Sequence, residues 1–134
     1  MNNKHLVAVY GSLLSGLGNN PVIQNENTEL LGEIISEPVY TLYDLGYFPG
    51  LHENGSTAVK MEVYSVDDEI ALDVDGLEGY SPDRPATFYD KKSIETPWGT
   101  ASVYIYMGNP EEDQIIESGD WKSHYLEKRQ VYEY

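Results

Sequence analysis

Glu78 is the acidic residue of this sequence with the clearest signs of a chemical role. It lies in the segment Gly76-Leu77-Glu78-Gly79-Tyr80, between two glycines and close to a leucine and a tyrosine. Apolar neighbours remove water from a carboxylate, and burial raises the pKa of a glutamic acid towards neutrality. A glutamate with such a pKa takes up and returns a proton at physiological pH. The alternative is an ordinary surface glutamate, since most acidic side chains lie on the surface.

A second candidate is the turn Tyr10-Gly11-Ser12-Leu13, which follows the apolar run Leu6–Val9. The run predicts a short buried strand, and Gly11-Ser12 lets the backbone turn sharply where that strand ends. Successive N–H groups at such a turn form a concave set of donors that can hold a carboxylate or a polarised carbonyl oxygen. An ordinary junction between a strand and a loop is the alternative. The functional hypothesis therefore depends on pairing this turn with Glu78.

Charge and composition exclude several classes of function. The chain of 134 residues has 23 acidic and 8 basic side chains, which gives a formal net charge of −15. We expect no nucleic acid as a partner, because its phosphates are bound largely through Lys and Arg. No apolar run reaches the length of a membrane span, and Met1–His5 lacks the apolar core of a signal peptide. We therefore expect a cytoplasmic protein without a membrane partner.

The sequence also lacks the usual motifs for metals and cofactors. It contains no cysteine, so it can form neither a disulfide nor a zinc-thiolate site. His5, His52 and His124 do not have the spacing of metal ligands. The loop Ser15–Pro21 is rich in turn-forming residues but matches neither the phosphate-binding nor the dinucleotide-binding pattern. We expect no metal and no cofactor.

Period-two alternation and β-branched residues predict a fold made mainly of strands. Besides the opening strand, the expected strands are two between Thr28 and Tyr43 with a break at Pro38, a half-exposed strand over Thr57–Tyr64, and a hairpin of Thr87–Thr96 with Ala101–Met107. A turn is expected at Pro82–Pro85. The aromatic segment Asp44–Leu51 is expected to be a loop that plugs one end of a barrel or lines a pocket.

The best helix candidate ends at Leu77, directly before Glu78. Asp67 or Asp68 is placed to cap its N-terminus, and Ile70, Leu72 or Val74, and Leu77 could share one buried face. The segment after Trp121 is expected to be a mobile or helical tail.

Several short motifs occur in a fixed order along the chain. They are Tyr10-Gly11-Ser12-Leu13, Tyr47-Phe48-Pro49-Gly50-Leu51, Leu72-Asp73 with Leu77-Glu78-Gly79-Tyr80, Tyr89, and Val103-Tyr104. In order and spacing the sequence resembles the gamma-glutamyl cyclotransferase-like family over nearly its whole length, and its length is typical of the smaller members that act on gamma-glutamylamines. The resemblance implies a single domain over residues 1–134. It also implies an α+β fold, namely a small mixed β-barrel with short flanking helices.

The resemblance further implies a cavity for the gamma-glutamyl group of a small-molecule substrate. Glu78 would be the acid–base residue of an intramolecular cyclisation that forms 5-oxoproline and releases an amine. The other implied site residues are the backbone of Tyr10, Gly11, Ser12 and Leu13, which would bind the carboxylate or carbonyl oxygens, and Tyr89 and Tyr104, which would line the cavity. This reaction requires no protein nucleophile, metal or cofactor.

The chain departs from the family pattern at two places. Many relatives carry a basic residue soon after the opening motif and an arginine two residues beyond the position of Tyr89, whereas this chain has Leu14-Ser15 and Lys91. An anionic substrate would therefore meet less positive charge. Two alternatives stay open: a binding module of the same fold without turnover, and related amide chemistry on a different gamma-linked substrate. The sequence leaves the leaving amine and the oligomeric state open.

Overall fold

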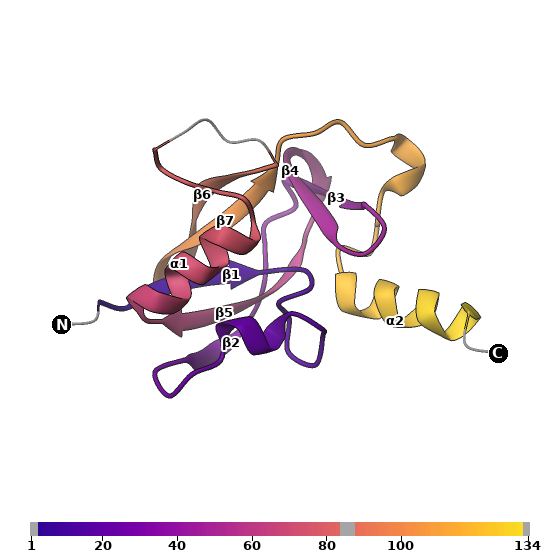
Figure 1. The fold of residues 1–134 in the computed structure, drawn as a ribbon. Helices are drawn as coiled ribbons and strands as arrows, with labels where there is room; N and C mark the ends of the chain where they lie inside the picture. The colour runs from indigo at the N-terminus through magenta and orange to yellow at the C-terminus, as the bar shows by residue number, and fades with distance from the viewer. Residues whose placement is uncertain (1–2, 84–87, 133–134) are drawn as a thin grey trace.

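An α+β fold is built around a five-stranded mixed sheet in the computed structural model, which describes residues 3–83 and 88–132 (Figure 1). The elements in chain order are β1 His5–Val9, η1 Asn20–Ile23, β2 Glu29–Ile35, β3 Tyr40–Asp44, β4 Pro49–Thr57, β5 Lys60–Val66, α1 Asp68–Leu77, β6 Tyr89–Thr96, β7 Gly99–Tyr106, η2 Glu112–Gln114 and α2 Trp121–Tyr132. The sheet order is β2-β5-β1-β7-β6. Pairing is antiparallel except between β1 and β7, which run parallel at Val7 and Ser102.

The α+β class is confirmed, but the sheet is not a closed barrel. Within the described residues β2 and β6 form its two edges, and β3 and β4 form a separate two-stranded hairpin. This hairpin packs against the sheet through β4 and β7 and does not join the two edges (Figure 1). The word barrel therefore describes this open sheet only loosely, because strand periodicity does not say which strands pair.

β1 is the middle strand of the sheet and confirms the predicted opening strand. Val7, Ala8 and Val9 are buried between the neighbouring strands β5 and β7. Apolar β-branched residues favour such a position because they pack well on both faces of a covered sheet. The turn that follows β1 therefore starts from the rigid centre of the fold.

The strand predicted to be half exposed is β5, and the prediction of exposure is wrong. All residues from Met61 to Val66 are buried. Ser15 donates its backbone N–H and its hydroxyl to Glu62 at 2.7 Å each, and the Tyr64 hydroxyl donates to Glu62 at 3.0 Å. Burial is the main reason why the pKa of Tyr64 is raised to about 12. The loop after β1 thus covers the polar residues of this strand.

α1 confirms the predicted helix and begins at the predicted cap. The Asp67 carboxylate accepts the Ile70 N–H at 2.9 Å, and this and further hydrogen bonds lower the Asp67 pKa to about 2. Ile70 and Val74 are buried, whereas Leu72 is 71% and Leu77 44% exposed. The buried face is therefore narrower than expected, because α1 rests on η1 and β1 along one side (Figure 1).

Two further segments differ in detail from the predictions. Within the predicted loop Asp44–Leu51, residues from Pro49 onward already belong to β4, and Leu51 is fully buried. The C-terminal segment is the helix α2, attached to the β3–β4 hairpin by His124 and Lys128, whose nitrogens lie 2.8 and 3.0 Å from Asp44 Oδ2.

The predicted turn at Pro82–Pro85 and the start of the strand predicted at Thr87 lie partly outside the described residues. The predicted hairpin is present as β6 and β7. In residues 3–83 and 88–132 no helix is long and apolar enough to cross a membrane.

Candidate active site

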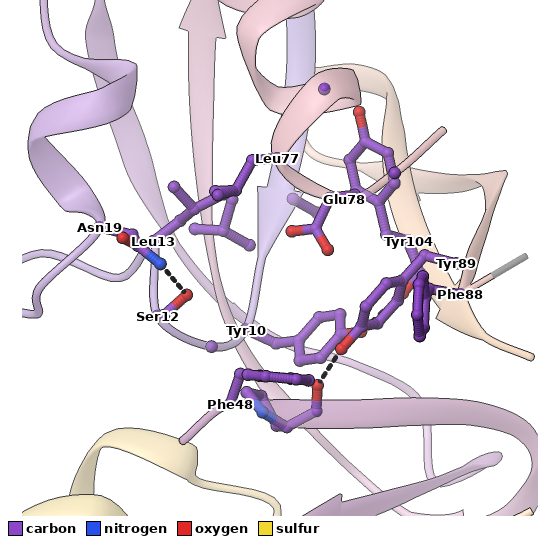
Figure 2. A pocket seen from close by; sticks show the side chains of 16 residues that line it. Tyr10, Ser12, Leu13, Asn19, Phe48, Leu77, Glu78, Phe88, Tyr89 and Tyr104 are labelled. Carbon is purple, nitrogen blue, oxygen red and sulfur yellow. Dashed lines mark hydrogen bonds between the residues drawn. The ribbon is translucent and has the colours of Figure 1, made fainter. Parts of the chain in front are cut away.

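A pocket of about 420 Å³ lies where the turn after β1, the end of α1 and the strands β6 and β7 meet (Figure 2). Its lining is mainly apolar and aromatic, with one carboxylate. The lining residues are Ala8, Val9, Tyr10, Gly11, Ser12, Leu13, Asn19, Phe48, Pro49, Gly76, Leu77, Glu78, Gly79, Phe88, Tyr89 and Tyr104. Such a volume and lining suit a small ligand held by a few polar groups.

Glu78 is placed by the way in which α1 ends. It is the C-terminal cap of the helix, and its backbone N–H donates to the Val74 carbonyl at 3.0 Å. Gly79 has a φ of +71°, which is a left-handed conformation that favours glycine. This turn lets the Tyr80 N–H reach the Asp75 carbonyl at 2.8 Å. The Glu78 carboxylate points into the pocket (Figure 2).

Burial raises the pKa of Glu78 from 4.5 to about 7. Within the described part of the chain, its carboxylate has no hydrogen bond or ion pair that would stabilise the charged form. The pKa values of Tyr10, Tyr89 and Tyr104 are raised chiefly by their own burial and also by the charge of Glu78. Glu78 therefore has the pKa that a proton carrier needs near neutral pH.

The three tyrosines form a fixed wall beside Glu78. Tyr10 donates its hydroxyl to the Tyr104 carbonyl at 2.6 Å, and Tyr89 donates to the Pro49 carbonyl at 2.7 Å. Tyr104 donates to Oδ1 of Asp75 at 2.5 Å. Because each hydroxyl already has an acceptor, the rings are held in place around the carboxylate.

The turn after β1 lines the same pocket through Gly11, Ser12 and Leu13. Asn19 donates its backbone N–H to the Ser12 carbonyl at 3.0 Å and its side-chain amide to the Ser12 hydroxyl at 2.9 Å. These bonds hold the turn, whereas the N–H groups of Gly11, Ser12 and Leu13 donate to no residue that the structure describes. They are available to an anionic group of a ligand.

The structure brings all the site residues predicted from the sequence into this one pocket. Their chemical roles stay predictions. The segment around Phe48 lines the pocket, which is one of the two roles expected for it, whereas Asn19 and Phe88 were not assigned to the site. Asp75 was also missed, because its contact with Tyr104 joins residues 29 positions apart and local sequence carries no signal for it. In the described ranges, no three His, Asp or Glu side chains are grouped in a way that could hold a metal ion.

Several known proteins are similar to this chain. The family model described as gamma-glutamyl cyclotransferase, AIG2-like, matches residues 7–123. A Vibrio cholerae protein, whose name gives gamma-glutamylcyclotransferase as a provisional activity, is 44% identical over 118 residues, which cover 88% of this chain and 96% of that protein. The Escherichia coli gamma-glutamylcyclotransferase family protein YtfP is 36% identical over 115 residues, covering 86% and 94%.

A solved structure of an uncharacterized protein from Pyrococcus horikoshii superimposes with a TM-score of 0.76 at 28% identity and covers 94% of this chain and 97% of that one. The structural likeness therefore extends over nearly the whole length of both chains. Together with the family match, which spans residues 7–123, it confirms the resemblance noted in the sequence. The chain belongs to the gamma-glutamyl cyclotransferase, AIG2-like, family.

Proposed function

We propose that this protein is a gamma-glutamyl cyclotransferase that converts a gamma-glutamyl amine or amide to 5-oxoproline and releases the amine. The observation that carries the proposal is the Glu78 carboxylate, which faces the pocket with a pKa of about 7, in a pocket that the turn after β1 also lines. Family membership and the names of the relatives support the same reaction class.

In the proposed reaction Glu78 takes a proton from the α-ammonium group of the substrate. The freed amine nitrogen attacks the γ-carbonyl carbon and closes a five-membered ring, while the N–H groups of Gly11, Ser12 and Leu13 hold the substrate carboxylate or the developing oxyanion. The bond between the carbonyl carbon and the leaving nitrogen then breaks. Two protons leave the attacking nitrogen and two reach the leaving nitrogen, with Glu78 as their carrier, so charge is conserved.

The pocket contributes to the rate mainly through geometry. The attacking amine and the carbonyl belong to one molecule, so holding that molecule folded places the reacting atoms together. The tyrosine wall and the turn after β1 are both fixed by hydrogen bonds and can hold a folded substrate without rearranging. A proton carrier with a pKa near the working pH contributes about 100- to 10,000-fold to such a reaction.

The test is release of 5-oxoproline from a panel of gamma-glutamyl amines, gamma-glutamyl dipeptides and glutathione. We expect the wild type to turn over at least one member and Glu78→Gln to lose at least about 100-fold in kcat/KM on it. Glu117→Gln is the matched control, because Glu117 is exposed on a loop outside the pocket. A flat result across the panel, or a Glu78→Gln variant as active as the wild type, contradicts the proposal.

A further inference from the structure

Three apolar side chains of the pocket are partly open to solvent, unlike the rest of its apolar lining. Phe48, directly before β4, is 46% exposed, Leu77 at the end of α1 is 44% exposed, and Phe88, directly before β6, is 64% exposed. The other apolar and aromatic side chains of the lining are buried. Large apolar side chains that stay exposed around a pocket mark a surface suited to an apolar ligand group. We call Phe48, Leu77 and Phe88 the apolar rim.

The pocket offers little to a second negative charge. Among the described residues that line it, none is Lys, Arg or His, and Glu78 is the one charged side chain. Lys91 follows the pocket residue Tyr89 by two positions, but its Nζ lies 3.1 Å from Oδ1 of Asp75. A ligand carboxylate at the apolar rim would therefore lose part of its water without gaining a cationic partner, in the same pocket as the Glu78 carboxylate.

The proposed reaction determines which part of a substrate meets the apolar rim. The glutamyl part must lie beside Glu78, because its α-ammonium group gives a proton to this carboxylate, which points into the pocket. The leaving amine must reach solvent once its bond is broken. The buried part of the lining belongs to the core and closes that path, so the amine departs past the apolar rim. In the view of Figure 2, Leu77 and Phe88 lie on either side of Glu78.

We propose that the apolar rim binds the leaving group, and that the protein prefers gamma-glutamyl amines whose amine carries an alkyl or aromatic group without a carboxylate. This inference rests on the proposed function and adds to it the chemical class of the leaving amine. Apolar atoms that leave water against the rim stabilise the complex. The carboxylate of an amino acid or dipeptide leaving group gains no such contact, so gamma-glutamyl dipeptides and glutathione are poorer substrates.

The test is kcat/KM for release of 5-oxoproline from two substrates whose leaving groups have the same shape. Gamma-glutamyl isobutylamide carries an isopropyl group where gamma-glutamylglycine carries a carboxylate. We expect kcat/KM of the wild type to be at least about 10-fold higher for the isobutylamide. Gamma-glutamyl n-butylamide is likewise expected to exceed the monoamide of 1,3-diaminopropane, because an ammonium group there replaces the last methyl group and loses water at the rim.

Substitutions in the apolar rim separate its effect from the intrinsic reactivity of the two substrates. Leu77→Lys adds a cation and is expected to lower the isobutylamide-to-glycine ratio of kcat/KM by about 2- to 5-fold. Leu72→Lys is the matched control, because Leu72 is 71% exposed on the same helix and outside the pocket. Phe88→Ala is expected to lower the ratio through lost apolar contact, with Tyr47→Ala, 88% exposed and outside the pocket, as its control. A change in the pKa of Glu78 acts on both substrates alike and leaves the ratio unchanged.

Binding without turnover tests the apolar rim apart from the proposed reaction. Isothermal titration calorimetry of the full chain carrying Glu78→Gln gives the Kd of the same two compounds, and we expect the isobutylamide to bind at least about 10-fold more tightly. This difference in Kd without any 5-oxoproline from the wild type would contradict the proposed reaction and support the rim. Equal or tighter binding of gamma-glutamylglycine, no measurable binding of the isobutylamide, or a ratio that Leu77→Lys leaves unchanged overturns the inference.

Discussion

Glu78→Gln is expected to stabilise the folded protein, and the gain should depend on pH. Burial raises the pKa of Glu78 from 4.5 to about 7, so the folded state keeps the proton over a range in which the unfolded state has lost it. Stability contributed by this group therefore falls as the pH rises from about 4.5 to about 7. The difference between a pKa of 4.5 and one of about 7, at about 1.4 kcal/mol for each pKa unit, corresponds to a loss of at most about 3.5 kcal/mol.

The assay is urea unfolding of the wild type and Glu78→Gln at several pH values between 4 and 8. The free energy of unfolding should be similar for both proteins near pH 4, where Glu78 is neutral, and higher for the variant by up to about 3.5 kcal/mol at pH 8. Glu117→Gln serves as the control, because Glu117 is exposed. A difference between the wild type and Glu78→Gln that is the same at pH 4 and pH 8 would refute the reasoning that burial alone sets this pKa.

Two further substitutions test how the site is supported. Gly11→Ala adds a Cβ that would lie 2.5 Å from Cγ of Pro49, so we expect a loss of about 1 to 3 kcal/mol in urea unfolding, and a wild-type value would contradict the close packing of the turn on β4. Asp67→Ala removes the cap of α1 and should lower the Tm. The pKa of Asp67 is lowered from 3.8 to about 2, so the difference in Tm between the wild type and Asp67→Ala should be largest above pH 4 and should shrink towards pH 2. A difference in Tm that does not change with pH would contradict this role of the Asp67 carboxylate.

Features with local signals are predictable from the sequence. A capping aspartate followed by apolar residues at helical spacing predicts α1, and the structure has the helix with Asp67 as its cap. The burial of Glu62 and Tyr64 is not predictable in this way, because their cover is the loop containing Ser15, 47 residues from Glu62. Apolar and polar residues do alternate along β5, but the polar face, which the alternation predicts to be exposed, is covered by the loop that contains Ser15.

In the candidate site, too, features with a local sequence signal are predictable and contacts between distant residues are not. Glu78 and the turn after β1 can be singled out because residues next to Glu78 along the chain, namely Gly76, Leu77 and Gly79, also line the pocket. The arrangement around Tyr104 depends on Asp75 and Lys91, which come from α1 and β6 and meet only when the sheet has formed. Such contacts follow from strand pairing, which local sequence patterns do not determine.

The most direct test of the central claim is the pH dependence of 5-oxoproline release by the wild type on its best substrate. If Glu78 accepts the substrate proton, kcat/KM must rise as Glu78 loses its own proton, with an acid limb near a pKa of about 7. We expect that limb in the wild type. Release of 5-oxoproline with an acid limb near the pKa of an ordinary glutamate, about 4 to 5, or no release at any pH, would contradict it.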